Sequence, residues 1–228
     1  VGPLVALWSR AQKASTPPDA SGIRRVLSLV NDQELDLDLR RSTAGLKRKG
    51  QSIDLGGIGK GYAGDRILEV YREYGITSAY SNLGGNVVTL GNKPDGSPWR
   101  VGIQHPRQED QLIGTVAVSE QTVVTSGDYQ RCFTDSRGMK YHHILNPATG
   151  CPANSGLISV TIVSARSLAA DALSTMLFVA GLEKGLQILK SYPQTGAILV
   201  DSAMRVYVTH DLRYRFQAAQ DIQMTILD

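Results

Sequence analysis

Residues 54–65, DLGGIGKGYAGD, combine five glycines with one lysine and two aspartates. Glycines allow a backbone to pass very close to a ligand, and a lysine among exposed backbone N–H groups is well placed to bind phosphate. Asp54, which opens this stretch, could hold a ribose hydroxyl or polarise a ligand. The alternative is a glycine-rich strand end packed beneath a helix, and these twelve residues alone leave both interpretations open.

Two common nucleotide motifs fail when they are checked in this stretch. Gly59, Gly61 and Gly64 form a G-x-G-x-x-G pattern, but a dinucleotide fold also needs an acidic residue about 20 positions further on. Residues 79–84 read AYSNLG and contain no acid. A Walker A loop needs Ser or Thr after Gly-Lys, whereas Lys60 is followed by glycine.

A second chemical pattern lies in residues 167–181, SLAADALSTMLFVAG, which we expect to form a helix. Asp171 and Thr175 are four residues apart and therefore share one helix face, with Ser174 at its edge. A carboxylate and hydroxyls are the hard oxygen donors that Mg²⁺ or Ca²⁺ takes. The alternative is a capping Asp and a Thr that bonds back to its own helix, and the spacing does not decide between them.

Adjacent histidines, His142 and His143, follow in a turn-rich stretch at 140–156. Neighbouring residues of a strand point to opposite faces, so we expect at most one of them in a given site. Histidine is the usual general base near neutral pH. The alternative for either residue is a hydrogen bond to the turn at 146–150. No G-x-S-x-G sequence and no protease-type Cys–His signature is found.

The elements that would position these residues follow an α+β pattern, with strands in adjacent runs and helices between the runs. We expect a turn and a short strand at 47–57, and a loop at 140–156. Helix 167–181 is expected to be capped by Ser164 or Ser167 and to end at Gly181. The other expected helices are 4–12, 22–30, 63–75 and 183–193, and the expected strand regions are 34–41, 78–91, 99–106, 114–133, 157–165 and 196–210.

Composition describes an ordinary globular chain, 42% hydrophobic and 20% charged with a net charge of +3. Its basic clusters are scattered and lack interleaved aromatics, which argues against nucleic-acid binding. No apolar run approaches the roughly 20 residues of a membrane helix. Cys132 and Cys151 indicate neither a zinc site nor a disulfide framework. The chain opens on VGPLVALW without an initiator Met, as expected of a processed N-terminus or of the interior of a longer protein.

Taken together, the segments DLGGIGKGYAGD, SNLGGNVV, TSGDYQRCF, HHILNPATG and ADALSTMLFVAG resemble the ApbE family of FAD:protein FMN transferases in order and spacing. The resemblance runs from VGPLVALW to about Tyr207. It implies a T-fold-like α+β domain over residues 1–228, with mixed, largely antiparallel sheets and packed helices. Family members normally carry a further part before VGPL, and they often have Ala at the position of Gly59 and Asp at that of Asn86.

The resemblance also implies a reaction. Family members bind FAD with Mg²⁺, cleave its pyrophosphate and attach FMN to a threonine hydroxyl of a target protein, releasing AMP. The targets are subunits of redox pumps of the Nqr and Rnf type or related flavin carriers. The usual location is the periplasmic side of the bacterial envelope, often with a lipid anchor. Alternatives are an FAD pyrophosphatase, which uses water as the acceptor, and a flavin-binding protein with little or no catalysis.

Roles for individual residues follow from the same resemblance. Mg²⁺ would be held by the Gly57 carbonyl, Asp171 and Thr175, with Ser174 as a further contact. FAD would be contacted by Asp54, Lys60 and Leu145. His143 would be the base for the acceptor threonine.

Overall fold

The computed structural model describes residues 1–227, which form two compact units. The first unit consists of Val1–Leu55 with Gln130–Ala153, and the second of Gly56–Tyr129 with the residues from Asn154 onward. The second unit is therefore interrupted in sequence by a piece of the first. That residues 1–228 form a single domain stays a prediction.

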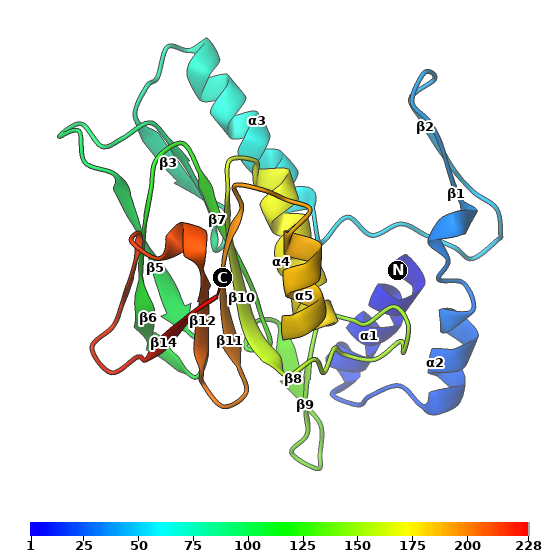
Figure 1. Ribbon diagram of the computed structural model, residues 1–228. Coiled ribbons are helices and arrows are strands. Elements are labelled where there is room, and N and C mark those ends of the chain that lie inside the picture. The colour runs from blue at the N-terminus through cyan, green and yellow to red at the C-terminus, as the bar shows by residue number, and fades with distance from the viewer. Residues whose placement is uncertain (228) are drawn as a thin grey trace. The chain divides into compact units, whose positions relative to one another are not determined.

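The first unit is built from short elements around a small apolar core. Leu4, Trp8, Ala11 and Leu145 are its buried members. Pro17 and Pro18 separate the first two helices, and the Asp19 carboxylate starts the second by accepting a hydrogen bond from Gly22 N at 2.7 Å. The elements of the first unit are α1 (Gly2–Ala14), α2 (Ala20–Leu27), the 3₁₀ turn η1 (Asp32–Glu34), the hairpin β1 (Leu35–Asp38) with β2 (Thr43–Leu46), and the hairpin β8 (Cys132–Thr134) with β9 (Lys140–His142) (Figure 1).

The second unit has a seven-stranded sheet at its centre, in the order β14-β12-β11-β10-β7-β4-β3. Every neighbouring pair is antiparallel except β12 with β14. Every residue of β10 is buried, so its continuous β-branched sequence fits a central strand. The strands are β3 (Ala79–Asn82), β4 (Asn86–Leu90), β7 (Thr122–Gly127), β10 (Leu157–Ser164), β11 (Gly196–Asp201), β12 (Val206–Thr209) and β14 (Met224–Leu227).

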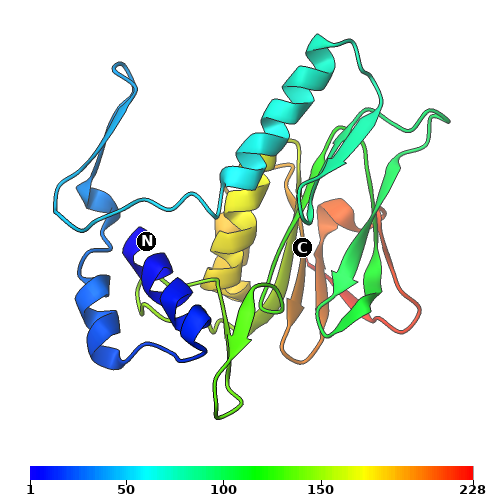
Figure 2. The same ribbon diagram turned by 180° about the vertical axis from the view of Figure 1, so that it is seen from behind.

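Further layers cover this sheet (Figure 2). Helix α4 (Ser167–Ala180) packs on β10 and β7, and α3 (Gly59–Glu73) packs on β4 and on α4. Helix α5 (Leu182–Leu189) packs on α4. A separate sheet joins β5 (Trp99–His105), β6 (Gln108–Val118) and β13 (Phe216–Ala218), and the 3₁₀ turn η2 (His210–Leu212) follows β12. Ile103 and Val116 of the three-stranded sheet share one apolar core with Val163 and Ile198 of the seven-stranded sheet.

Most expected elements are confirmed, and so is the α+β class with largely antiparallel sheets. Several local expectations were wrong, among them the loop at 140–156, which begins with β9. Residues 51–55 form no strand, and β2, a short and fully exposed strand, was not predicted. Helix α3 begins at Gly59 rather than at Ala63, so three of the glycines lie inside the helix. Glycine disfavours helices, and here the packing of α3 against α4 overrides that local preference.

Within the described residues, no helix is both long enough and apolar enough to cross a membrane.

Candidate functional site

Helix α4 carries the predicted carboxylate and hydroxyls on one side, as the spacing indicated. Asp171 is almost entirely buried, with 4% of its surface exposed, and Thr175 is half-buried. Ser174 is completely buried. The helix ends at Gly181, whose φ of 82° is a conformation that glycine adopts without strain.

The beginning of α4 differs from the expectation. Neither Ser164 nor Ser167 caps it, because the residue at the cap position is Arg166, which makes no capping hydrogen bond. The backbone N–H groups of Ser167 and Leu168 instead donate to the two oxygens of Asp65, at 2.7 and 3.0 Å. Asp65 belongs to α3, so the cap of α4 comes from a residue about a hundred positions earlier in the chain.

The Asp171 carboxylate faces the first turn of α3. Its Oδ2 atom accepts a hydrogen bond from the backbone N–H of Gly61 at 2.8 Å. Within residues 1–227 its other oxygen, Oδ1, accepts no hydrogen bond. One oxygen therefore fixes the carboxylate in place while the second remains available for a ligand.

Three hydroxyl groups form a cluster beside the backbone of Asp171. Ser126 of β7 places its Oγ 2.8 Å from Ser174 Oγ and 3.3 Å from Thr175 Oγ1. Ser174 Oγ donates to the Asp171 backbone carbonyl at 2.9 Å. A methyl group placed on Gly57 would lie 3.8 Å from Thr175 Oγ1. The structure thus brings Gly57, Asp171, Ser174 and Thr175 together, and adds Ser126.

The donor atoms of this cluster suit a hard divalent cation. They are one carboxylate, three hydroxyls and a backbone carbonyl, all of them oxygen. In the described part of the chain no three His, Cys, Asp or Glu side chains gather into a metal-binding group. A cation held by a single carboxylate keeps much of its charge for a further anionic ligand, such as a phosphate.

Lys60 is the second residue of α3. It is half-buried, and among the described residues its ammonium group makes no hydrogen bond or ion pair. The backbone N–H groups at the start of a helix and a lysine both favour anions. Lys60 is therefore available to bind a phosphate.

Asn86, at the start of β4, belongs to a buried polar network under the first turn of α4. Its Oδ1 lies 3.3 Å from Ser167 Oγ and 3.4 Å from Thr122 Oγ1. Its Nδ2 has no hydrogen-bond partner within the described residues. Asn86 is fully buried, which fits a supporting role beneath α4 rather than contact with a ligand.

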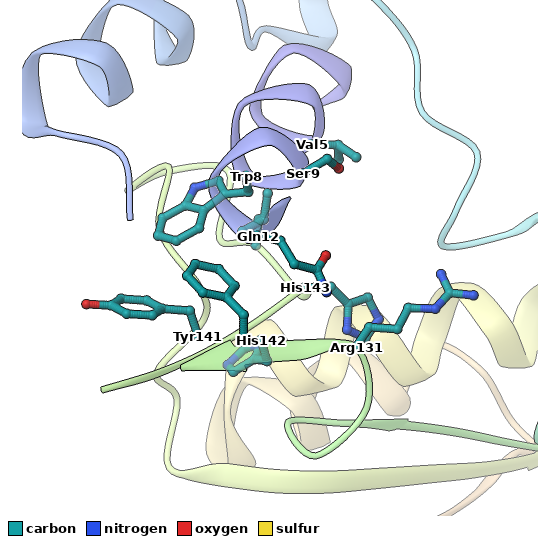
Figure 3. A pocket seen from close by; sticks show the side chains of 10 residues that line it. Val5, Trp8, Ser9, Gln12, Arg131, Tyr141, His142 and His143 are labelled. Carbon is teal, nitrogen blue, oxygen red and sulfur yellow. The ribbon is translucent and has the colours of Figure 1, made fainter. Parts of the chain in front are cut away.

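A pocket of about 50 Å³ in the first unit contains two of the other predicted residues, His143 and Leu145 (Figure 3). Trp8 and Tyr141 lie at one end, and His143 and Arg131 at the other. Tyr141 stacks on Phe133 with ring centroids 5.2 Å apart. Leu145 is buried and pairs with Pro152 in an isolated antiparallel bridge. The lining therefore combines aromatic rings with the polar side chains of His143 and Arg131.

The two histidines have different environments. His142 donates from Nε2 to the Ala153 carbonyl at 3.0 Å and accepts the Ile144 N–H at Nδ1 at 3.2 Å. Both of its ring nitrogens are therefore used inside the fold. His143 is exposed, and its Nδ1 lies 3.1 Å from the Gln130 carbonyl. A carbonyl only accepts, so Nδ1 carries the proton and Nε2 has the lone pair that a general base needs.

Asp54 is exposed and lies in the first unit, where it lines a larger cavity of about 610 Å³ together with the turn at Pro147 and Ala148. Asp54, His143 and Leu145 belong to the first unit, whereas Gly57, Lys60, Asp171, Ser174 and Thr175 belong to the second. The roles of all eight residues stay predictions.

Sequence reasoning missed three contributors, namely Ser126, Gly61 and Asp65. Ser126 lies in TSGDYQRCF, one of the segments that carry the family resemblance. Asp65 ends the DLGGIGKGYAGD segment, and an Asp inside a helix without a local partner is a signal for a contact with another element. No spacing rule relates these residues to α4.

Comparisons with known proteins show which family the chain resembles. Residues 1–199 match the model of the ApbE family. The chain is 39% identical to an FAD:protein FMN transferase of Klebsiella pneumoniae, covering 95% of this chain and 66% of that protein. It is 34% identical to an FAD:protein FMN transferase of Treponema pallidum, covering 90% and 60%. The crystal structure of the ApbE protein of Thermotoga maritima superposes with a TM-score of 0.84 at 31% identity, covering 94% of this chain and 70% of that one.

This α+β chain has the fold of the Thermotoga maritima ApbE structure. The chain belongs to the ApbE family. It spans less than two thirds of the length of the two curated relatives described above.

Proposed function

We propose that the protein of which this chain is part is an Mg²⁺-dependent FAD:protein FMN transferase. It cleaves the FAD pyrophosphate, attaches FMN to a threonine hydroxyl of a target flavoprotein and releases AMP. Membership of the ApbE family supports the activity. The observation that carries the proposal is the buried Asp171 carboxylate, fixed through one oxygen, together with the hydroxyl cluster of Ser126, Ser174 and Thr175 beside the Asp171 backbone.

The residues of the second unit would bind the pyrophosphate. Asp171, Thr175 and the Gly57 carbonyl would hold Mg²⁺, with Ser174 as a further contact. When bound, the ion would neutralise the charge that develops on the phosphates. Lys60 would bind a phosphate oxygen by charge-assisted hydrogen bonds. Asp54 and Leu145 would contact FAD.

His143 would accept the proton of the acceptor hydroxyl at Nε2. The threonine oxygen would form a bond to the phosphorus of the FMN half while the bond from that phosphorus to the bridging oxygen breaks. AMP would leave with that oxygen. Such a transfer depends more on positioning and charge stabilisation than on a strong nucleophile.

The partner and the location are part of the proposal. A redox subunit of the Nqr or Rnf type, or a related flavin carrier, would supply the threonine. The enzyme would act on the periplasmic side of the bacterial envelope, attached by a lipid anchor. Both points rest on the resemblance to the family.

The test is to incubate the full-length protein with FAD, Mg²⁺ and an acceptor domain, and to measure the acceptor mass and released AMP. A mass gain of one FMN less one water, with one AMP released per modified acceptor, is expected. Absence of both would contradict the enzyme and leave a flavin-binding protein. AMP and free FMN with an unmodified acceptor would instead identify an FAD pyrophosphatase.

A further inference from the structure

Helices α3 and α4 meet near their N-terminal ends, and neither has a local cap (Figures 1 and 2). The residue at the cap position is Ile58 for α3 and Arg166 for α4, and neither side chain makes a capping hydrogen bond. Unsatisfied N–H groups at a helix start carry partial positive charge. Two such ends in contact repel each other unless anionic groups lie between them.

Each helix supplies the missing cap of the other. Asp65 of α3 accepts the N–H groups of Ser167 and Leu168, the first two residues of α4. Asp171 of α4 accepts the N–H of Gly61, the third residue of α3. The two carboxylates thus form a reciprocal pair that joins the two helix starts, and we call Asp65 and Asp171 with these bonds the reciprocal cap.

The glycines of α3 allow the two helices to approach closely enough for this exchange. A Cβ on Gly61 would lie 2.5 Å from the Ser167 carbonyl oxygen and 2.7 Å from Asp171 Cβ. A Cβ on Gly64 would lie 2.6 Å from Ser167 Oγ. All three distances are shorter than van der Waals contact, so any side chain at either position would force the helices apart.

We propose that Asp65 is a positioning residue for the cation site. Asp65 fixes the first turn of α4 against α3. This sets the place at which Asp171 accepts the hydrogen bond of the Gly61 N–H, and it keeps the second oxygen of Asp171 available. It also holds Thr175 beside Gly57. This inference rests on the proposed function, because it assigns Asp65 a role in the site where Mg²⁺ would bind.

The experiment compares Asp65→Ala and Asp65→Asn with Asp19→Ala in the full-length protein. Asp19 is a matched control, because it also caps a helix, α2, but that helix carries none of the predicted site residues. Amide hydrogen exchange of Gly61, Ser167 and Leu168 is measured by NMR. Mg²⁺ affinity is measured by titrating MgCl₂ and following the Gly61 and Asp171 amide resonances.

We expect Asp65→Ala to lose exchange protection at Ser167, Leu168 and also Gly61, and to weaken Mg²⁺ binding about tenfold or more, as substitutions behind a metal ligand do. Asp65→Asn keeps one acceptor oxygen and should give an intermediate effect. Asp19→Ala should leave the Gly61 amide and the Mg²⁺ affinity unchanged.

Unchanged Gly61 protection in Asp65→Ala would overturn the inference. If Asp65→Ala does not fold, Asp65→Asn decides, and wild-type protection and affinity in that variant would overturn it as well. A wild-type protein that binds no Mg²⁺ would contradict the cation site of the proposed function. Loss of Gly61 protection in Asp65→Ala would then still support the positioning of Asp171 by Asp65.

Discussion

Asp171 of α4 accepts a hydrogen bond from the backbone N–H of Gly61 in α3, 2.8 Å away and 110 residues earlier in the sequence. The residue expected to bind Mg²⁺ is therefore also the cap of another helix. These two roles use different oxygens of one carboxylate, and they can be separated by substitution.

Asp171→Asn is expected to keep the fold and lose the activity, because an amide oxygen still accepts from Gly61 but the ligand charge is gone. We expect activity to fall by more than about 100-fold, since even residues behind a metal ligand contribute 10- to 100-fold. Asp171→Ala should in addition lower the free energy of unfolding by about 1 kcal/mol, the usual cost of a lost cap. AMP release and urea unfolding measure the two effects. Full activity of Asp171→Asn would refute the metal assignment.

Gly61→Ala is expected to destabilise the second unit by roughly 1–3 kcal/mol, as overpacking of a close contact does. Its Cβ would meet the backbone of Ser167, which cannot move away without shifting α4. Gly59→Ala is the matched control, because no atom lies within 4 Å of a Cβ there. That variant should be as stable as wild type or more stable by up to about 1 kcal/mol. Thermal unfolding of both variants checks this, and equal stability would contradict the packing argument.

His143→Gln is expected to reduce FMN transfer by about 10²- to 10⁴-fold, the usual contribution of a general base. Binding of FAD should change little, because the substitution removes a proton acceptor rather than a phosphate ligand. Single-turnover transfer and FAD fluorescence titration separate the two quantities.

His142→Gln provides the comparison for His143. Both ring nitrogens of His142 are hydrogen-bonded to the backbone, so its loss should lower the free energy of unfolding by roughly 1–2 kcal/mol. A His142 variant that is less active than His143→Gln while equally stable would reverse the assignment of the base.

Acid is expected to destabilise the first unit through Asp135. The Arg137 guanidinium, together with the backbone N–H groups of Arg137 and Met139, holds the pKa of this buried carboxyl below its ordinary value of 3.8, against the opposing effect of burial. Because the folded-state pKa is lowered, this stabilisation is complete above pH 3.8 and is lost as the pH falls through the folded-state pKa. NMR titration of the Asp135 carboxyl carbon gives that pKa.

Asp135→Asn is the control for the acid effect, because the amide does not titrate. Its free energy of unfolding should fall less than that of wild type below pH 3.8. Equal losses in both proteins would show that another carboxyl is responsible.

The sequence predicted the parts of the site that lie within one element. Asp171 and Thr175 share a face because α4 formed where its apolar spacing indicated. The start of α3 was misjudged because its glycines have no local reason to be helical. Their reason is the backbone of α4, which is far away in sequence. Asp65 and Ser126 were missed for the same cause, since no local pattern relates them to α4.

The second unit is interrupted in sequence, which has a consequence for biosynthesis. Its first segment ends at Tyr129 and its second begins at Asn154. Gly61 and Asp65 are synthesised long before Asp171. Strand β7 is likewise synthesised before β10, the strand with which it pairs. Contacts between such distant segments form slowly. The contacts of Asp171 with α3 therefore form only after residues 61–171 have all been made.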